Sequence, residues 1–567
     1  MQLSEYYKDT EFVHCYRALK YCENVVSGQI PAGKYTLLAC KRQLKDLQNQ
    51  TEFKFDPVKA ERICNFVESM PHTKGKWAQK KETIKLEPWQ SFILSTPFGW
   101  VDDKGNRRFT EIYAEIPRKN GKSVIASGIG NYMLAMDDEY GAEIYSGATT
   151  EKQAWEVFRP AKIMVEKNQV FREEFGIQVN AKSLFIPWNG SKFEPVIGNP
   201  GDGASPHCWI LDEYHEAKDS KQRDTAKTGM GSRDQPMLLI ITTAGFDQYS
   251  ACYDVRIETS KILDESIVND RFFGIIYHID KDDDWSKPES LRKANPNMGV
   301  SVSERFLLDQ QQDAINNPNK QNAFRTKHCN EWVGAKTAYF NMQKWQECGD
   351  DNLTIESVIN KDSYLSADLS SHIDFTSIIH LFTELVGDKR HYYLFAEHYL
   401  PESAIANEKT GNYRMWAEHG LINVADGEEI DFQKVEDDIL ESWELYPAVK
   451  EVAYDPLKAQ QLSQRLRENH NVQMVEYGQT VFNMSAPMKE LESAINSGRV
   501  HHNNDPILTW MFSNVIGKLD RKDNVYPNKE RRENKIDAAV ATIMAIGRAT
   551  LNEDNGDMSG FLSNPII

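Results

Sequence analysis

Between residues 84 and 245, short apolar runs alternate with amphipathic stretches, a pattern typical of parallel strands covered by helices. The four clearest runs predict buried strands at residues 112–116, 142–145, 208–211 and 237–242. The first 60 residues are charged and predict helices without a chemical motif. We therefore predict a helical N-terminal segment over residues 1–60 and an α/β domain with a parallel-type sheet over residues 61–255.

A second α/β pattern begins near residue 360. Residues 364–369, 375–382 and 391–395 predict strands, and Gly387-Asp388 predicts a turn that joins the last two in a hairpin. A further apolar strand is predicted at residues 449–455, and an apolar helix begins near residue 536. These features predict a second α/β domain over residues 351–552.

The residues between the two α/β patterns are polar and predict mainly helices. Two loop signals lie among them, Asp282-Asp-Asp284 and Asn295-Pro-Asn297. We expect residues 256–350 to form a helical lid or linker region. The segment 553–567 is rich in Gly, Ser and Asn, and we expect a flexible tail there.

Composition supports a globular protein of more than one domain. The chain has 567 residues, of which 40% are hydrophobic and 11% aromatic, which excludes a disordered chain. With 66 Lys and Arg against 84 Asp and Glu, the net charge of −18 argues against a protein that coats nucleic acid by bulk charge. Local basic strips at residues 74–85 and 518–535 are still suited to transient contact with phosphate. The second strip has seven Lys or Arg against four Asp or Glu, and a solvated charged loop explains it equally well.

The cysteine pattern and the hydropathy indicate the cellular compartment of the protein. The eight cysteines form no Cys-x-x-Cys pair and no zinc-finger spacing, so we expect reduced thiols. No apolar run approaches the roughly 18 residues of a membrane span, and the N-terminus lacks the signal-peptide pattern. We expect a soluble protein of the cytoplasm with no membrane partner.

The first candidate site lies between the strand at 112–116 and the helix that follows it. Strand, loop, Gly-Lys-Ser and helix is the context of a P-loop, in which Lys122 reaches the β- and γ-phosphates and Ser123 holds Mg²⁺. The first glycine of the usual P-loop pattern is replaced by Ile116. The predicted phosphate-binding residues are Pro117, Arg118, Lys119, Asn120, Gly121, Lys122 and Ser123.

Two later strands carry polar residues where a P-loop ATPase needs them. Asp212 and Glu213 end an apolar strand, where the first carboxylate would hold Mg²⁺ and the second would polarise the attacking water. Thr242 and Thr243 end the next strand and can sense the γ-phosphate. Each motif alone is compatible with an ordinary core strand. Their order and spacing together predict an ATPase that uses ATP and Mg²⁺.

Upstream of the P-loop, Trp89 and Gln90 offer an aromatic face and an amide suited to an adenine base. The alternative is a helix N-terminus with Pro88 in its first turn. The sequence favours neither interpretation.

The second candidate site consists of three aspartates that are far apart in the sequence. Asp368 lies in a predicted strand, Asp455 ends another, and Asp537 opens the apolar helix. This order is that of a ribonuclease-H-like nuclease, in which two Mg²⁺ or Mn²⁺ ions about 4 Å apart support phosphodiester cleavage. Asp374 is expected to be a turn residue, or else a fourth metal ligand.

An ATPase joined to such a nuclease resembles the large terminase subunits of tailed bacteriophages. The resemblance spans about residues 60–550 and is carried by several segments: Trp89-Gln90, residues 117–123, Leu211-Asp-Glu-Tyr-His-Glu216, Ile241-Thr-Thr-Ala-Gly245, Ala294-Asn-Pro-Asn297, Asn330-Glu-Trp332, Ala367-Asp-Leu-Ser370 and Lys535-Ile-Asp537. It implies an N-terminal P-loop ATPase domain, a helical lid or linker and a C-terminal ribonuclease-H-like nuclease domain.

The resemblance also implies a function and partners. The chain would form a ring, with five subunits expected, on the portal protein of the procapsid in the host cytoplasm. There it would drive double-stranded viral DNA inward and cut the concatemer, together with a small terminase subunit. In the family an arginine finger assists hydrolysis, and Arg118 acting in cis and Arg159 acting in trans are the two candidates.

Two other functions fit parts of the sequence. A helicase or another translocase would use the C-terminal domain only for binding, and would lack metal-dependent cleavage. A portal-docking or capsid structural protein would carry a vestigial nucleotide site. The presence of Lys122, Ser123, Asp212 and Glu213 argues against that last possibility.

Overall fold

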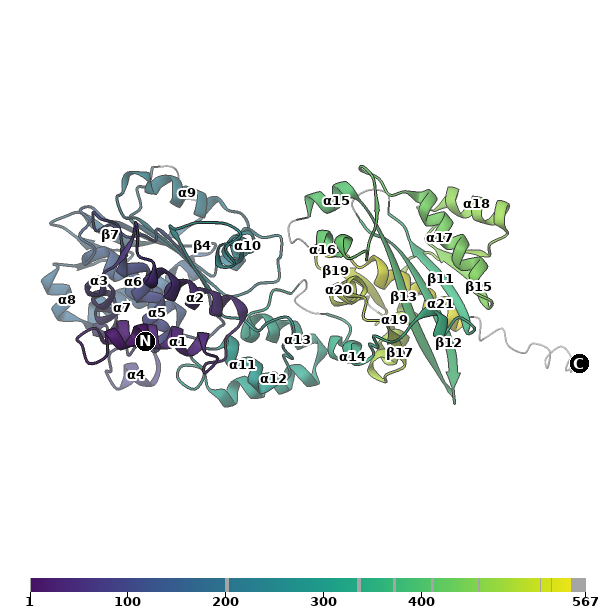
Figure 1. Ribbon diagram of the computed structural model, residues 1–567, viewed down its shortest axis with the longest axis horizontal. Helices are drawn as coiled ribbons and strands as arrows, with labels where there is room; N and C mark the ends of the chain where they lie inside the picture. Colours follow the sequence, from purple (N-terminus) through teal and green to yellow (C-terminus); the bar gives the residue numbers. More distant parts are fainter. Residues whose placement is uncertain are drawn as a thin grey trace, which may run out of the picture. The chain divides into compact units, whose positions relative to one another are not determined.

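The chain forms two compact units. The computed structural model describes residues 2–198, 203–333, 338–370, 374–408, 412–456, 459–520, 522–531 and 533–551. Unit 1 comprises Met1–Gln312 and Phe324–Val333, and unit 2 comprises Asp313–Ala323 and Gly334–Ile567. Each unit contains its own sheet with covering helices (Figure 1). The boundaries expected after residues 60, 255 and 350 fall inside these units and stay predictions.

Unit 1 is built on an eight-stranded sheet in the order β10-β3-β9-β8-β4-β7-β6-β5. The strands from β10 to β7 run parallel, and β6 and β5 are antiparallel additions at one edge. The predicted strands are confirmed. The strands are β3 (Glu111–Glu115), β4 (Glu143–Ala148), β5 (Gln178–Val179), β6 (Leu184–Ile186), β7 (Ser191–Ile197), β8 (Cys208–Asp212), β9 (Met237–Thr242) and β10 (Phe272–Ile276).

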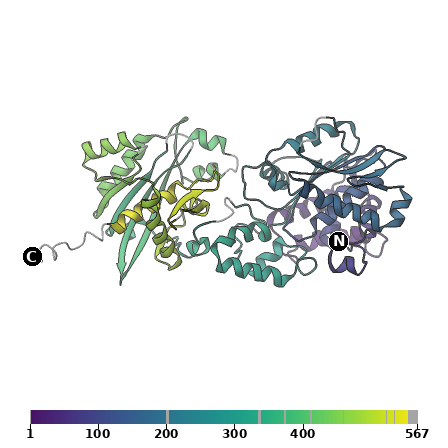
Figure 2. The ribbon, with the colours of Figure 1, turned by 180° about the vertical axis from the view of Figure 1, so that it is seen from behind.

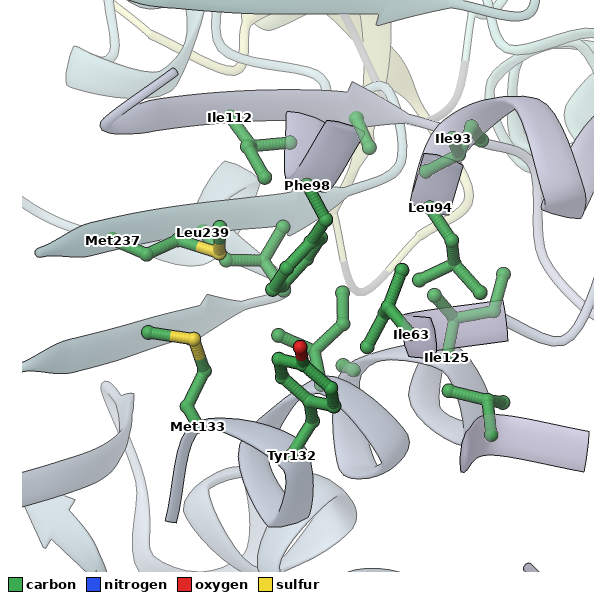
Figure 3. Packing of buried hydrophobic residues seen from close by; sticks show 14 of the residues in the cluster. Ile63, Ile93, Leu94, Phe98, Ile112, Ile125, Tyr132, Met133, Met237 and Leu239 are labelled. Carbon is green, nitrogen blue, oxygen red and sulfur yellow. The ribbon is translucent and has the colours of Figure 1, made fainter. Parts of the chain in front are cut away.

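The core of unit 1 lies between this sheet and the helices α3 (Pro57–Ser69), α5 (Pro88–Gly99) and α6 (Lys122–Ala135). Figure 3 shows side chains of these helices pointing toward β3 and β9: Ile63, Phe98, Ile125, Tyr132 and Met133 opposite Ile112, Met237 and Leu239. Nearly all of α6 is buried, as expected for a helix that is apolar all round. The helix that follows the P-loop is therefore fixed firmly against the sheet.

The N-terminal residues belong to the same core. Helix α1 (Val13–Val26) packs against α5, and α2 (Lys34–Gln48) lies beside the edge strand β10. Thr36 Oγ1 donates a hydrogen bond to the carbonyl of Ile276 at 2.7 Å, and Arg42 donates to the carbonyl of Phe272 at 2.9 Å. The helix thus covers a sheet edge whose backbone groups would otherwise stay open.

The region after unit 1's central strands is less regular than the sequence predicts. It contains α10 (Ala251–Leu263), α11 (Pro288–Ala294), α12 (Glu304–Asn316), α13 (Pro318–Phe324) and a one-turn π-helix at Arg325–Cys329. The predicted helices are present. The sequence analysis missed β10, whose five residues are all buried and which extends the parallel sheet beyond β3.

Unit 2 is built on a seven-stranded sheet in the order β14-β13-β12-β11-β15-β16, with β17 paired to β13. Strands β11 to β13 form an antiparallel meander, β15 runs parallel to β11, and the predicted turn at residues 387–388 joins β12 to β13. The strands are β11 (Asp362–Asp368), β12 (Thr376–Val386), β13 (Lys389–Pro401), β14 (Asn423–Ala425), β15 (Val449–Tyr454), β16 (Met474–Glu476) and β17 (Val500–His502).

Helices cover both faces of this sheet, as Figure 2 shows from behind. On one face, Tyr364 packs in a core with α19 (Val481–Asn496), α20 (Pro506–Asn514) and α21 (Asp537–Leu551). On the other face, the next residue, Leu365, packs with α17 (Phe432–Leu445) and α18 (Gln460–His470). A separate hairpin of β18 (Val515–Leu519) and β19 (Val525–Lys529) follows α20. Alternation along β11 thus fills two cores at once.

Two further observations concern the whole chain. All eight cysteines are buried and none is bonded in a disulfide. Within the described part of the chain, no helix combines the length and the apolar character that a bilayer span needs.

Candidate functional site

The predicted P-loop forms the turn between β3 and α6. Gly121 has a φ of 86° and caps α6, and Lys119 also has a positive φ, of 71°. Glycine adopts this left-handed region without strain, which explains Gly121 at the cap. The Lys122 side chain folds back over the turn, and its Nζ donates to the carbonyl of Ile116 at 2.8 Å. The turn therefore surrounds its own lysine, although the first glycine of the usual pattern is missing.

A loop from the middle region holds the P-loop in place. Asn120 Nδ2 donates to Asn295 Oδ1 at 3.0 Å, and the backbone N–H of Asn297 donates to Asn120 Oδ1 at 3.0 Å. Ser301 Oγ donates to the carbonyl of Lys119 at 2.6 Å. The sequence analysis marked Asn295-Pro-Asn297 as a loop and as part of the family resemblance, without assigning it a contact. The sequence analysis missed the function of this loop, because no local pattern reveals a contact between residues that are about 175 positions apart.

Asp212 and Glu213 lie at the carboxyl end of β8, two strands away from β3 in the sheet. The Lys122 ammonium is 3.9 Å from Glu213 Oε1. Burial and then the charge of Glu213 raise the pKa of Asp212 to about 7. Burial opposes ionisation of Glu213 as well, but Lys122 and His215 outweigh it and lower the pKa of Glu213 to about 2. The lysine and both predicted carboxylates therefore meet in one site.

The end of β9 is linked to Glu213 through a histidine that the sequence analysis did not select. His215 Nδ1 lies 3.2 Å from Glu213 Oε2 and 3.1 Å from Thr242 Oγ1. Thr243 Oγ1 is 3.4 Å from the same nitrogen. Glu213 itself has a left-handed backbone with a φ of 48°. The predicted pair Thr242 and Thr243 thus contacts the carboxylate through His215.

Trp89 and Gln90 lie beside the P-loop at the start of α5. Trp89 is only 2% exposed, and its Nε1 donates to Asn297 Oδ1 at 3.1 Å. Gln90 completes a capping box with Glu87, so the helix-start interpretation is correct. Trp89 also lines a cavity of about 240 Å³, together with Tyr277 and Asn295. The two interpretations of this motif are therefore compatible.

The two candidate arginines occupy different positions. Arg118 is half-buried in the P-loop, and its backbone N–H donates to the carbonyl of Lys327 at 3.1 Å. Arg159 is exposed on α7 (Glu151–Lys167), where its guanidinium lies 5.6 Å from the Trp155 ring centroid. Arg118 is thus close to the site of its own chain, whereas Arg159 projects from the surface.

In unit 2, the three predicted aspartates are all positioned at element ends. Asp368 is the last residue of β11, and Asp455 directly follows the adjacent parallel strand β15. Both carboxylates act on Tyr526 of β19, whose pKa is raised by burial and then by the charges of Asp368 and Asp455. Gln479, which the sequence analysis missed, donates from Nε2 to Asp368 Oδ1 at 3.0 Å.

Asp537 opens α21, as predicted, and is half-buried. Its Oδ2 has no hydrogen-bond partner among the described residues. Burial and the charge of Asp374 raise the pKa of Asp537 to about 6, against the opposing charges of Lys529 and Lys535. Asp374 forms an ion pair with Lys535. Asp374 therefore acts on the same site, which leaves its predicted choice between turn residue and ligand open.

The carboxylates of unit 2 are suitable ligands for a cation, but they do not form a complete coordination site. Among the residues that the structure describes, no group of three or more His, Cys, Asp or Glu side chains is arranged to hold a metal ion. The orphaned oxygen of Asp537 is nevertheless an acceptor that a metal cation can satisfy. Carboxylate oxygens are the donors that Mg²⁺ and Mn²⁺ prefer.

The two predicted basic strips have different structures. Residues 518–535 include the turn and second strand of the β18–β19 hairpin, with Lys518 and Lys522 exposed. The strip at 74–85 includes the short helix α4 (Gly75–Gln79) and exposes Lys74, Lys76 and Lys80. The hairpin brings its strip to the strand that carries Tyr526, next to Asp368 and Asp455.

Comparison with known proteins gives matches along most of the chain. Protein YmfN of Escherichia coli strain K12 is 43% identical over 374 residues, covering 64% of this chain and 82% of that protein. The large terminase subunit of Enterobacteria phage HK97 is 27% identical over 499 residues, covering 86% of this chain and 95% of that protein. The crystal structure of the HK97 large terminase aligns with a TM-score of 0.42 and 24% identity, over 86% of this chain and 99% of that one.

Two family models match in succession. Residues 88–261 match the ATPase domain of the terminase large subunit, and residues 266–553 match its endonuclease domain. Together they account for the P-loop site of unit 1 and the aspartates of unit 2. The predicted fold class is confirmed, with a P-loop ATPase and a nuclease domain in one chain. The chain belongs to the family of terminase large subunits, the enzymes that join an ATPase to an endonuclease for the packaging and cleavage of viral DNA.

Proposed function

We propose that unit 1 hydrolyses ATP with Lys122, Asp212 and Glu213 as its central residues. The observation that carries this proposal is the meeting of these three side chains at the carboxyl end of the sheet, with Lys122 3.9 Å from Glu213. Because Glu213 has a pKa of about 2, it is ionised at neutral pH and can polarise the attacking water through a hydrogen bond. Lys122 exchanges the carbonyl of Ile116 for a phosphate oxygen when nucleotide binds.

Ser123 and Asp212 are the residues of this site that would hold Mg²⁺. The ion supplies charge for the β- and γ-phosphate oxygens. The backbone N–H groups of residues 119–123 bind the phosphates, and Thr242 and Thr243 sense the γ-phosphate through His215. Trp89, which lines the 240 Å³ cavity, and Gln90 would contact the base.

The arginine finger has two candidates, and their positions separate them. Arg118 is close to its own P-loop and would act in cis, whereas the exposed Arg159 would reach the nucleotide of a neighbouring subunit in trans. We expect Arg159→Ala to abolish ATPase activity although the P-loop is intact, because such a finger contributes roughly 10³–10⁵ in rate. Mixing the Arg159→Ala chain with Lys122→Ala chains tests the trans role. If wild-type Arg159 on the Lys122→Ala partner restores no activity, Arg159 does not act in trans.

In unit 2, Asp368, Asp455 and Asp537 would hold Mg²⁺ or Mn²⁺, with Asp374 as a fourth carboxylate. The supporting observation is the buried Asp537 oxygen without a hydrogen-bond partner in the described residues. When bound there, such ions would supply the positive charge that phosphodiester cleavage needs on the attacking water and on the leaving oxygen. Gln479 orients Asp368, and the β18–β19 hairpin contacts the phosphate backbone of double-stranded DNA.

The assembly is also part of the proposal. The chain would form a homo-oligomeric ring, with five subunits expected, on the portal protein of the procapsid. A small terminase subunit would select the DNA. Support comes from the family to which the chain belongs and from the exposed Arg159, which a ring would place beside a neighbouring subunit. Mass measurement of the chain bound to isolated portal rings tests the stoichiometry, and a single bound copy would contradict it.

The ATPase assignment is tested by phosphate release from ATP. Wild-type protein, Lys122→Ala and Glu213→Gln are compared at saturating Mg²⁺, with the exposed Lys80→Ala as the matched control. We expect both site variants to lose activity and the control to keep it. Retained hydrolysis in Lys122→Ala would refute the assignment.

A further inference from the structure

The segment that follows the π-helix contacts residues at the ends of β3, β9 and β10, beside the predicted nucleotide site. Asn330, which is completely buried, has a left-handed backbone with a φ of 60°. Its Oδ1 accepts a hydrogen bond from the backbone N–H of Ala244 at 2.7 Å, directly after Thr243. Its Nδ2 donates to the carbonyl of Tyr277 at 2.7 Å and lies 3.4 Å from Glu115 Oε1. One side chain thus bridges β9, β10 and β3.

Glu115 shows why this bridge matters for the P-loop. It is the last residue of β3, two positions before Pro117, and is 0% exposed. Such a buried carboxylate is costly unless it is paired and hydrogen-bonded. Its partners include Arg256 Nε at 3.4 Å, the hydroxyl of Tyr113 at 2.6 Å and Trp332 Nε1 at 3.1 Å.

Trp332 also contacts the turn after β9. A Cβ added at Gly245 would lie 3.0 Å from the Trp332 ring and 3.2 Å from His215 Cβ. The carbonyl of Trp332 accepts a hydrogen bond from Gln248 Nε2 at 2.9 Å. Gly245 is therefore enclosed between the histidine that contacts Glu213 and the tryptophan that contacts Glu115.

These contacts cross the boundary between the two family matches. The ATPase match ends at residue 261, yet Asn330 and Trp332 lie in the region matched by the endonuclease model, which begins at residue 266. The same segment also accepts a hydrogen bond from the Arg118 N–H through the carbonyl of Lys327, at 3.1 Å. The segment returns to unit 1 from Asp313–Ala323 of unit 2 and continues after Val333 into unit 2 again.

We propose that Asn330 is a positioning residue of the ATPase site. It fixes the turn after β9 relative to Glu115, the last residue of the strand that leads into the P-loop. Asn330 acts through other residues. Ala244 and Gly245 fix the positions of Thr242, Thr243 and His215. Glu115 fixes the end of β3 that leads into the P-loop. The ATPase site is therefore completed by the segment that connects the two units. This inference rests on the proposed role of Thr242 and Thr243 in hydrolysis.

The test uses the full-length chain with Asn330→Gly. Glycine adopts the left-handed backbone without strain, so this variant removes only the amide. The matched control is Asn471→Gly, because Asn471 is also left-handed, with a φ of 52°, but is exposed at the end of α18. Asn330→Asp keeps the acceptor for Ala244 and faces Glu115 with a like charge. Gly245→Ala disturbs the same contact from the other side.

We expect kcat for ATP hydrolysis to fall about tenfold in Asn330→Gly and Gly245→Ala and further in Asn330→Asp. ADP affinity should change less than about twofold, because Asn295, Asn297 and Ser301 still hold the P-loop. Asn471→Gly should match the wild type. Equal kcat in Asn330→Gly and wild type would overturn the inference. A parallel loss of kcat, ADP affinity and melting temperature would also overturn it, since that pattern indicates a merely structural residue.

Different experimental results would refute the proposed function and this inference. Activity retained in Lys122→Ala would refute the ATPase site itself. Activity lost in Lys122→Ala but unchanged in Asn330→Gly would refute only the positioning role.

Discussion

Glu213 in unit 1 and Asp537 in unit 2 have pKa values shifted in opposite directions. In unit 1, Glu213 has a cation, Lys122, at 3.9 Å, and its pKa is about 2. In unit 2, the charge of Asp374 acts on Asp537, whose buried Oδ2 has no hydrogen-bond partner in the described residues and whose pKa is about 6. In the first site the lysine outweighs burial and keeps Glu213 ionised, whereas in the second Lys529 and Lys535 do not outweigh burial and the charge of Asp374.

This difference indicates how each site is prepared for its reaction. A site with an internal cation is organised before its ligand arrives, so we expect nucleotide binding to exchange the partner of Lys122. A site whose own lysines do not outweigh the repulsion between its carboxylates is electrostatically strained until a metal binds. Metal binding should therefore stabilise unit 2, and the two sites should respond differently to mutation and pH.

The largest expected effect is the loss of the internal cation. Lys122→Ala should lower the ATPase rate at least about a hundredfold, the scale seen when one preorganised charge-stabilising group is removed. DNA cleavage should be unchanged, because the aspartates belong to unit 2. Phosphate release and plasmid digestion on the same preparation measure both. A parallel loss of both activities would contradict the independence of the two sites.

The second prediction concerns the stability of unit 2. Because the pKa of Asp537 rises from 3.8 to about 6, its contribution to stability is complete below pH 4 and is lost as the pH rises through 6. At pH 7.5 without divalent cations, Asp537→Asn should raise the free energy of unfolding by up to about 3 kcal/mol. At pH 4 the gain should vanish.

Denaturant unfolding at the two pH values measures this difference. The exposed Asp388→Asn, in the turn between β12 and β13, is the control and should change little at either pH. Mg²⁺ should stabilise the wild type at pH 7.5 and have less effect on Asp537→Asn. Equal destabilisation by Asp537→Asn at both pH values would contradict the account.

Much of both sites could be predicted because their signals are local. Gly121 and Lys122 follow a buried strand and open an apolar helix, and together with the carboxylates that end β8 this context predicts a phosphate loop. Asp368, Asp455 and Asp537 each lie at the end of an apolar element, so hydrophobic periodicity located them. The same periodicity predicted both sheets.

Other parts depend on contacts that no local pattern reveals. Asn295 and Asn330 contact residues 175 and 86 positions away, and each looks like an ordinary loop asparagine in the sequence. Strand β10 is a five-residue apolar run inside a polar region, too short to distinguish from a helix segment. Gln479 is an unremarkable polar residue until the fold brings it to Asp368.

A third prediction concerns pH in unit 1. Burial raises the pKa of Asp212 to about 7, and this carboxylate must be ionised to hold Mg²⁺. Lowering the pH from 8 to 6 should therefore raise the Mg²⁺ concentration for half-maximal ATPase activity about tenfold. Titration of Mg²⁺ at constant ionic strength measures the change. A half-maximal concentration that is independent of pH would show that Asp212 does not hold the ion.

The smallest expected effect comes from Lys535. Its charge opposes the rise in the pKa of Asp537, and it forms an ion pair with Asp374. Lys535→Gln should shift the pH midpoint of DNA cleavage upward by less than about one unit. Lys522→Gln, in the exposed turn of the hairpin, should leave the midpoint in place. A downward shift would mean that Lys535 does not stabilise the ionised carboxylates.

The most direct test of the central claim, a metal-dependent nuclease site beside an independent ATPase, is digestion of a plasmid in the presence of Mn²⁺. Wild-type chain and Asp368→Ala are compared at equal concentration, and both are checked for ATP hydrolysis. The account predicts cleavage by the wild type, none by Asp368→Ala, and equal ATPase rates. Absence of cleavage by the wild type, or equal cleavage by both, would contradict it.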